Sequence, residues 1–247
     1  MKQDLIEVDK IHFNELREHV DQDKIDTLMS NFIQQFTYDS ITMEGKNVLK
    51  KSDVTNLLNK KIIVTQLPER EQKEALNHLK AFEHVLKFVT SRKELTEDIL
   101  KDLHEILMDG ILMGGQYRKV NIQIKESMHQ PPDYVKVYDR MAKFFFDLEN
   151  FKGTTLQKAC FAHAQIFKIY PFLEGNGRLA RLVLNYILLF DGYMPVSIPV
   201  SKKAEYLNHI DTFKEERDLS PFVGFVEKLL LEAYETYIEY LENKNPY

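Results

Sequence analysis

The sequence predicts an all-α protein that carries one short β-hairpin. Most of the chain repeats its apolar residues at spacings of three and four, which places them on one face of a helix. A single stretch, between residues 114 and 132, repeats them at every second position instead. Apolar residues make up 44% of the 247, which is enough for a sizeable core.

The helical pattern is clearest in five segments: 75–89, 96–111, 156–170, 178–190 and 221–243. The second of these also shows helix boundaries. Thr96 is a favourable N-cap because its hydroxyl can accept a hydrogen bond from the first turn. Gly110 favours a helix end because glycine adopts left-handed backbone conformations readily.

Residues 114–132 read GGQYRKVNIQIKESMHQPP and alternate apolar with polar residues through Val120, Ile122 and Ile124. This period of two, ended by a double proline, is typical of a strand. We interpret the segment as a β-hairpin inserted into a helical protein. A lone hairpin is marginally stable unless it is packed, so it is suited to be a flap over a site. A passive connection is the alternative.

Composition excludes several classes of function. The net charge of −5 argues against a nucleic-acid binder that relies on a basic face. The single cysteine, Cys160, excludes internal disulfides and suits a reducing compartment. The N-terminal residues lack the apolar core of a signal peptide, and no segment reaches 18 uncharged apolar residues. We therefore expect a cytoplasmic protein without nucleic-acid or membrane partners.

Residues 168–186, KIYPFLEGNGRLARLVLNY, contain the only Gly-x-Gly of the chain. Gly175 and Gly177 fall in a tight turn before a new helix, where unpaired backbone N–H groups favour an anion. Arg178 and Arg181 are three apart, so they share a helix face and can reach the same polyphosphate. Glu174 adds a carboxylate of the kind that holds Mg²⁺ beside phosphates. The segment therefore predicts a site for a phosphorylated ligand.

These residues resemble the motif of the Fic family, His-Pro-Phe-x-Asp/Glu-Gly-Asn-Gly-Arg-x-x-Arg. Residues 170–181, YPFLEGNGRLAR, match it except at the first position, where Tyr170 stands in place of histidine. The similarity extends over roughly residues 70–235. It implies a Fic-type helical bundle with a β-hairpin flap and an N-terminal helical extension. Residues 1–69 would form the extension, and residues 70–247 the Fic core with its flap and C-terminal helices.

The resemblance implies a protein adenylyltransferase, which uses ATP and Mg²⁺ to transfer AMP to a hydroxyl of a target protein and releases pyrophosphate. Glu174 would hold the Mg²⁺, and the two arginines would bind the β- and γ-phosphates. Tyr206 resembles a tyrosine on the adenine side. The nucleotide-binding residues implied in this way are Glu174, Gly175, Asn176, Gly177, Arg178, Leu179, Ala180, Arg181 and Tyr206.

The same resemblance implies how the target is held. The flap strand Ile122, Gln123, Ile124 and Lys125 would align a target segment by adding a strand, main chain to main chain. The acceptor would be a Ser, Thr or Tyr hydroxyl, on another protein or on this chain itself. Related folds also use other phosphate-containing donors, so the donor is a separate question. A homodimer is a further hypothesis, because apolar positions in IEVDKIHF and in EAYETYIEYL could supply an interface.

Residues 40–45, SITMEG, resemble the inhibitory motif of the family, Ser/Thr-x-x-x-Glu-Gly/Asn. Ser40 and Glu44 are four apart and share one face of a helix, and Gly45 follows them. By this resemblance Glu44 would pair with Arg181 and deny it to the γ-phosphate, so that ATP binds unproductively. The structural alternative is a plain helix end closed by Gly45.

Tyr170 stands where the family has the histidine that deprotonates the target hydroxyl. An imidazole with a pKa of about 6.5 suits that task, whereas a phenol with a pKa of about 10 is a poor base at pH 7. Losing a general base typically lowers a rate by about 10² to 10⁴. On a helix, His163 would lie about 10 Å from Tyr170 along the axis. The sequence places neither His104 nor His129 near it.

Three explanations of Tyr170 stay open from the sequence: a natural loss, a deliberate inactivating substitution, or slower or altered chemistry. Two function hypotheses follow. The first is an adenylyltransferase restrained by Glu44 and impaired at Tyr170. The second is an inactive nucleotide-binding pseudoenzyme or scaffold of the Fic type.

Overall fold

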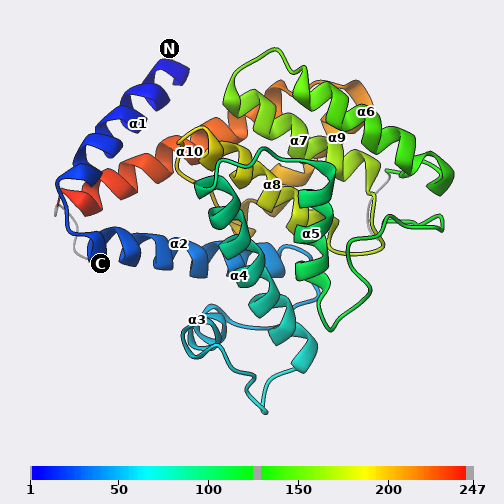
Figure 1. The fold of residues 1–247 in the computed structure, drawn as a ribbon, viewed down its shortest axis with the longest axis horizontal. Coiled ribbons are helices and arrows are strands. Elements are labelled where there is room, and N and C mark those ends of the chain that lie inside the picture. The colour runs from blue at the N-terminus through cyan, green and yellow to red at the C-terminus, as the bar shows by residue number, and fades with distance from the viewer. Residues whose placement is uncertain (1, 125–128, 243–247) are drawn as a thin grey trace.

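The computed structural model describes residues 2–124 and 129–242, which contain ten α-helices and two short 3₁₀ helices (Figure 1). In chain order they are α1 (Lys2–Glu18), α2 (Gln22–Thr42), α3 (Lys51–Lys60), α4 (Glu69–Thr90), α5 (Glu97–Met108), η1 (Tyr134–Lys136), α6 (Val137–Glu149), α7 (Thr155–Ile169), α8 (Asn176–Phe190), η2 (Val200–Lys202), α9 (Lys203–Glu216) and α10 (Ser220–Leu241). These described ranges hold no β-strand, so the all-α prediction is confirmed.

Local chemistry explains where the predicted helices begin and end. Thr96 caps α5 by accepting a hydrogen bond from the N–H of Ile99 at 3.2 Å, and Gly110 follows the helix with φ 65°. A capping box starts α7, because the side chains of Thr154 and Gln157 each accept from the other's backbone N–H. These boundaries agree with the sequence pattern.

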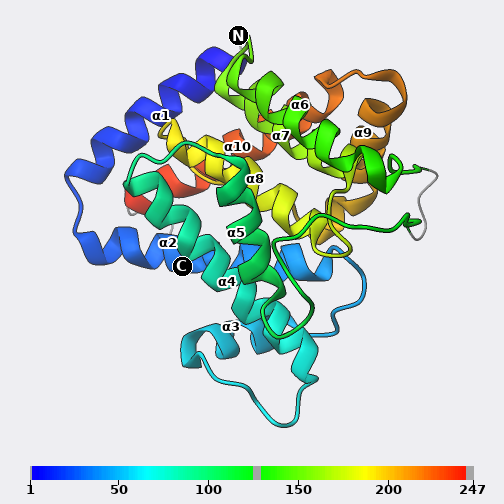
Figure 2. The ribbon, with the colours of Figure 1, turned by 45° about the vertical axis from the view of Figure 1, so that its right-hand side comes forward.

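The centre of the bundle is α8, which is packed against α7 and crossed by α4 and α5 (Figures 1 and 2). Every residue of α8 from Arg178 to Leu188 is buried, together with Asn176. A helix that is buried on all sides has no solvent face, so its polar residues must find partners inside the protein. This requirement shapes the site at its N-terminal end.

The N-terminal helices share the main hydrophobic cluster with the rest of the chain. In α1, Phe13 packs edge-on against Tyr234 of α10, with ring centroids 6.1 Å apart. In α2, the ring of Phe36 packs against that of Phe82 in α4, with centroids 5.4 Å apart. A second, smaller cluster joins α3 to α2 and α4. The predicted extension, residues 1–69, is therefore packed onto the core along much of its length.

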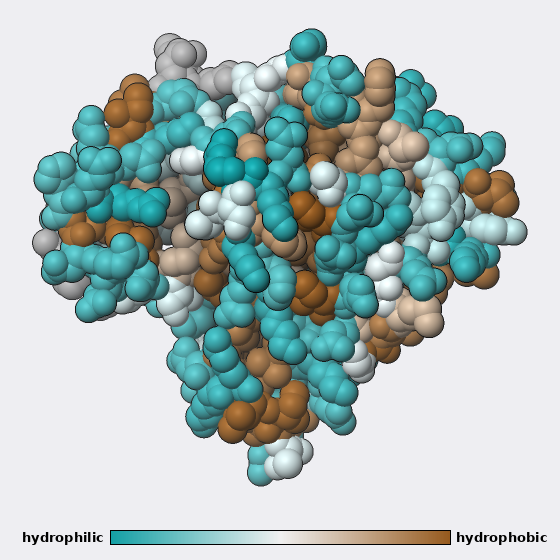
Figure 3. All heavy atoms as spheres, in the orientation of Figure 1, coloured by the Kyte–Doolittle hydropathy of each residue, from teal (hydrophilic) through white to brown (hydrophobic). Residues whose placement is uncertain are grey.

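The surface shown in Figure 3 is largely hydrophilic. Hydrophobic residues gather at its lower tip, which is formed by the segment between α3 and α4, where Ile62 and Ile63 are 57% and 42% exposed. Of the helices described, none combines the length and the apolar character that crossing a membrane requires.

The paired strands predicted for residues 114–132 are not confirmed, because residues 114–124 and 129–132 contain no strand. Arg118, only 2% exposed, connects the two arms in their place. Its guanidinium donates to the carbonyl oxygens of Val120, Pro132 and Tyr170. A buried side chain thus satisfies carbonyls that a strand ladder would use, and the two consecutive prolines have no N–H to donate to such a ladder.

We expect Phe36→Ala to lower the free energy of unfolding by about 3–5 kcal/mol, because the ring is 1% exposed and its loss leaves a cavity between α2 and α4. Urea unfolding followed by circular dichroism and by tyrosine fluorescence would measure this. Both probes should report one coincident transition, since the extension and the core share a cluster. Phe146→Ala, at a ring 65% exposed, is the matched control and should change the value by less than about 0.5 kcal/mol.

Candidate functional site

The loop between α7 and α8 is held in one conformation by its own residues. Tyr170 ends α7 in the left-handed region, with φ 51°, and its N–H donates to the carbonyl of Ile166 at 2.8 Å. The following Pro171 disfavours a helical backbone at Tyr170, which explains the helix end. The buried amide of Asn176 closes the loop, since it accepts from the N–H of Phe172 at 3.0 Å and donates to the same residue's carbonyl at 2.9 Å. The side chain of Asn176 therefore stabilises the loop conformation.

Gly175 begins α8 with φ 76°, a conformation that side chains rarely adopt. A Cβ at this position would lie 2.9 Å from Sδ of Met108 and 3.4 Å from Nε2 of His104, both on α5. The backbone can therefore approach α5 only because the residue is glycine.

His104 supports this loop from α5. Its Nδ1 accepts from the N–H of Gly115 at 3.0 Å, so its Nε2 carries the proton and donates to the carbonyl of Glu174 at 2.9 Å. The imidazole also stacks on Phe172, with centroids 3.6 Å apart. Burial lowers the pKa of His104 to about 4, with a smaller contribution from the Arg178 guanidinium. A neutral histidine with both nitrogens engaged has no lone pair left for catalysis.

Arg178 and Arg181 lie in the first turns of α8 and are 1% and 2% exposed. Arg181 donates through Nε to Oγ of Ser40 at 2.9 Å and through Nη2 to the carbonyl of Ser40 at 2.7 Å. Arg178 donates through Nε to Glu44 at 3.2 Å, and its Nη2 lies 3.7 Å from Glu74. Its Nη1 is buried without a hydrogen-bond partner among the described residues. Nη1 of Arg178 is therefore a buried donor group whose hydrogen-bonding capacity the described residues leave unused.

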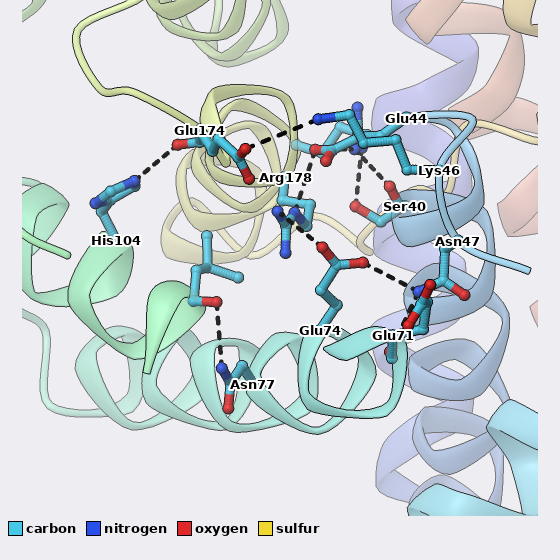
Figure 4. Close-up of polar contacts among 12 residues, drawn as sticks. Ser40, Glu44, Lys46, Asn47, Glu71, Glu74, Asn77, His104, Glu174 and Arg178 are labelled. Atoms are coloured by element: carbon cyan, nitrogen blue, oxygen red, sulfur yellow. Dashed lines mark hydrogen bonds and ion pairs between the residues drawn. The ribbon is translucent and has the colours of Figure 1, made fainter. Parts of the chain in front are cut away.

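Glu44 lies just beyond the end of α2, in contact with Arg178 (Figure 4) and close to Arg181. Its Oε1 is 3.2 Å from Nε of Arg178 and 3.9 Å from Nη2 of Arg181, so its closer contact is with Arg178 rather than with the predicted partner. A Cβ on Gly177 would lie 3.4 Å from the same oxygen, so glycine leaves room for the carboxylate beside the N-terminus of α8. Ser40, also from the SITMEG segment, is the residue that holds Arg181.

A second layer of charges covers Glu174, the predicted Mg²⁺ ligand. Arg70 of α4 donates to its Oε2. Nζ of Lys46 lies 3.8 Å from its Oε1, a contact that Figure 4 draws. Arg70 also lies 3.5 Å from Glu74, whose other oxygen accepts from Asn47 at 3.1 Å. Charges of alternating sign therefore run from Lys46 through Glu174, Arg70 and Glu74 to the buried Arg178.

The end of α2 is anchored independently of the arginines. Asp39, 3% exposed, accepts from Oγ of Ser197 at 2.8 Å and from the N–H of Val200 at 3.3 Å. Burial raises the pKa of this carboxyl, and the hydrogen bonds act against that rise. Beside it, Thr37 bonds to His78 of α4 at 3.0 Å. These contacts fix the position from which Ser40 and Glu44 reach the site.

Other residues of the predicted nucleotide site lie in the core. Leu179 and Ala180 have no exposed surface, so only their backbone groups could face a ligand. Tyr206 is also fully buried, and its hydroxyl bonds to Nε2 of His163 at 2.9 Å. Burial raises the pKa of Tyr206 to about 12. Gly45, with φ 71°, turns the chain after Glu44.

The predicted flap residues divide into two groups. Ile122, Gln123 and Ile124 are described and form no strand, whereas Lys125 lies outside the described residues. Near them, Nε2 of His129 donates to the carbonyl of Lys168 at 2.9 Å, so this nitrogen carries the proton. His129 therefore presents its Nε2 to the backbone of α7 rather than to Tyr170.

The phenol of Tyr170 is less acidic than a free tyrosine. Burial raises its pKa most, and the carboxylates of Glu44 and Glu174 raise it further, against a smaller opposite effect of Arg178. Phenolate is therefore scarcer at pH 7 than in a model peptide. A neutral phenol can donate a hydrogen bond but accepts a proton poorly.

Comparison with known proteins shows that this chain is similar to Fic proteins. The model of the Fic/DOC family matches residues 94–188, which include α5, α6, α7 and most of α8. The protein adenylyltransferases Fic of Drosophila grimshawi and Drosophila erecta are 26% and 27% identical over 209 residues, and the alignments cover 83% of this chain. The chain spans about two fifths of the length of these curated relatives, with coverage of 42% and 41%.

Solved structures share the fold. A Fic-domain-containing signaling protein from Bacteroides thetaiotaomicron superposes with a TM-score of 0.88 at 20% identity, over 98% of this chain and 99% of that one. A Fic family protein from Desulfovibrio desulfuricans gives a TM-score of 0.76 at 25% identity, over 98% and 76%. Residues 94–188 therefore match the Fic/DOC family, and the all-α fold of the chain is that of these solved Fic proteins.

We expect His104 to make the protein less stable in mild acid. Its pKa is about 6.5 in the unfolded chain and about 4 in the folded one, so the unfolded state binds more protons between these values. The free energy of unfolding should fall as the pH is lowered through this window, by about 3 kcal/mol from His104 alone. Burial lowers the pKa of His78 and His163 too, which adds in the same direction.

Urea unfolding at pH 7, 5.5 and 4.5 would measure this slope. His104→Gln retains a donor and an acceptor but does not titrate, so its slope should be smaller by up to about 1.4 kcal/mol per pH unit. His84→Gln, which removes a surface histidine, is the control and should retain the full slope. Equal slopes for all three proteins would show that His104 titrates normally.

Proposed function

We propose that this protein is a Fic-type protein adenylyltransferase, which transfers AMP from ATP to a hydroxyl of a protein target. The observation that carries the proposal is the convergence of Arg178 and Arg181 at the glycine turn that begins α8. The curated relatives that bear the name protein adenylyltransferase support the reaction type. The cation pair and the helix N-terminus are suited to a polyphosphate.

The residues present fit ATP. The buried Nη1 of Arg178 lacks a partner in the described chain, and a phosphate oxygen could accept from it. Gly177 leaves the helix N-terminus accessible to an anion, where Glu44 now lies. When bound, ATP would supply the transferred AMP and the pyrophosphate leaving group. Arg178 and Arg181 would orient the β- and γ-phosphates and offset their charge.

Glu174 fits a more limited role towards Mg²⁺. No cluster of three or more His, Cys, Asp or Glu side chains able to hold a metal occurs among the described residues. Mg²⁺ bound with a nucleotide needs only one or two carboxylates in addition to phosphates and water. Glu174 would provide one, after its contacts with Arg70 and Lys46 are released.

Two sets of contacts support autoinhibition within this proposal. Glu44 occupies Nε of Arg178 and approaches Arg181, so it competes with phosphate for both cations. Arg70 and Lys46 occupy Glu174, so they compete with Mg²⁺ for the carboxylate. All three competing groups come from the end of α2 and the start of α4, so one displacement of this region would release both halves of the site.

The second candidate is a nucleotide-binding protein of the Fic type without transfer activity. Tyr170 favours it, because burial and two carboxylates raise the pKa of the only side chain at the position of the base. Neither His104 nor His163 offers a substitute, since both are buried, both nitrogens of His104 are engaged, and Nε2 of His163 bonds to Tyr206. In the transferase proposal, Tyr170 instead makes transfer slow.

Label transfer from α-labelled ATP to the protein itself distinguishes the two. We expect Glu44→Gly with Tyr170→His to incorporate label about 10² to 10⁴ times faster than Glu44→Gly alone, because imidazole restores a general base. Histidine also tolerates the left-handed backbone of this position. Equal, rapid labelling would show that no base is needed at residue 170. No labelling of either variant, with ATP binding intact, would favour the second candidate.

Removing Arg70 and Lys46 should make Mg²⁺ bind more easily with nucleotide. In the Glu44→Gly background, we expect Arg70→Ala with Lys46→Ala to lower the Mg²⁺ concentration for half-maximal binding of a non-hydrolysable ATP analogue by about tenfold, or ~1.4 kcal/mol. Calorimetric titration over a Mg²⁺ series would measure it. Lys73→Ala is the control, because Lys73 pairs with Glu69 on the same helix. An unchanged Mg²⁺ requirement would remove Arg70 and Lys46 from the inhibitory mechanism.

Target docking by residues 122–125 and dimer formation are further parts of the proposal. In α1, Leu5, Val8 and Ile11 are all more than half exposed, which supports an interface there. In α10, Tyr234, Tyr237 and Leu241 are buried in the core, so this helix has less to offer. We therefore place the proposed dimer contact on α1.

A further inference from the structure

A pocket of ≈630 Å³ lies between α6, α7 and α9, next to the segment that begins at His129. It is separate from the site at α8, because no residue of the glycine turn and neither buried arginine lines it. Its volume falls in the range of small-molecule sites, about 300–1,000 Å³. The proposed transfer reaction makes no use of this pocket.

Aromatic and aliphatic side chains form its inner wall. Phe144 of α6, Ile169 of α7 and Phe213 of α9 line it and are 1%, 5% and 6% exposed. Phe161 adds a half-buried ring 6.3 Å from that of Phe144. This wall is rigid, because its residues belong to packed helices, and it presents ring faces to an apolar or aromatic group.

Positive charges surround the opening. Arg140, Lys168 and Arg217 line the pocket, and none of them makes a carboxylate contact within the part of the chain that the structure describes. A fourth cation, Lys143, is already paired with Asp147 at 2.8 Å. Three positive charges therefore lie around one apolar pocket without local compensation.

These charges act on each other as well as on a ligand. Burial lowers the pKa of Lys168 most, and the nearby charges of Arg217 and Arg140 lower it further. The Lys168 ammonium lies 5.2 Å from the ring centroid of Phe213, so the polar opening and the apolar wall meet at this residue. An anion placed here would relieve the repulsion among the three cations while its body covers the rings.

We propose that this pocket binds a small organic anion that combines an aromatic ring with a phosphate. The ring would lie on Phe144 and Phe213, and the phosphate would bind Lys168 and the guanidinium groups of Arg140 and Arg217. Arginine suits a phosphate because its planar donors bind two oxygens at once. A dianion matches the uncompensated charge better than a single carboxylate does.

The test uses phenyl phosphate, the smallest probe with both parts, on the full chain. Calorimetry should show binding at least tenfold tighter than that of inorganic phosphate, which lacks the ring, and of benzyl alcohol, which lacks the charge. Methyl NMR should show the largest shifts at Ile169 and Leu219, which line the pocket. Equal affinity for phenyl phosphate and inorganic phosphate, or shifts confined to α8, would overturn the proposal.

Variants locate the binding. Arg140→Gln with Arg217→Asn should weaken phenyl phosphate binding at least tenfold; asparagine is chosen because residue 217 has φ 60°. Both arginines are exposed, so the fold should be retained, which circular dichroism would check. Lys143→Gln, at the paired cation of the same pocket, should change affinity less than twofold. Arg178→Ala should have no effect, and loss of binding in this variant would place the probe at α8 and overturn the proposal.

Discussion

Two guanidinium groups inside the bundle determine much of this structure. Arg178 and Arg181 belong to a helix that is buried on every side, and each is almost inaccessible to water. An unpaired charge in such a place destabilises a protein by several kcal/mol, so compensating groups must be brought to it. The end of α2 supplies Ser40 and Glu44, and α4 supplies Glu74. The packing of the N-terminal helices on the core is thus also an electrostatic requirement.

The compensation is incomplete, and this has a consequence for function. Nη1 of Arg178 keeps no partner in the described chain, and Arg178 has only two carboxylate contacts, at 3.2 and 3.7 Å. In the proposed function, a polyphosphate would take over the role of Glu44 with more charge and more acceptor oxygens. The internal carboxylate is then a substitute for the ligand, and the two compete for the same cations. Inhibition and binding would share one set of contacts.

The loop before α8 contains no group that readily accepts a proton at the position of Tyr170. His104 is neutral and has both nitrogens engaged, and burial raises the pKa of the Tyr170 phenol. Neither group is suited to accept a proton from an incoming hydroxyl at neutral pH. The loop is therefore well built to position a ligand, through Asn176, Gly175 and Arg118, and poorly equipped for proton transfer. This contrast is why the proposal treats binding and transfer separately.

Local sequence patterns were sufficient to predict the helical class, both ends of α5, and the glycine turn with its two arginines. These features depend on local spacing, capping and backbone preference, which act within a few residues. The SITMEG segment likewise indicated that Glu44 belongs to the site. The alternation of apolar residues in 114–132 predicted paired strands, which the described residues of this segment do not form; Arg118 satisfies the carbonyls of Val120 and Pro132 instead.

The partners of the charged groups could not be predicted from the sequence. Arg70, Glu74 and His104 lie about 70 to 100 residues before their partners in α8 and its preceding loop, as the separation of 104 residues between Arg70 and Glu174 illustrates. No local pattern marks such pairs. The pocket between α6, α7 and α9 could not be predicted either, because its cations lie on α6, on α7 and just after α9, and they form a cluster only once those helices pack. Contacts of this kind follow from the shape of the folded chain, because burial and distance, not spacing in sequence, set the energy of a charge.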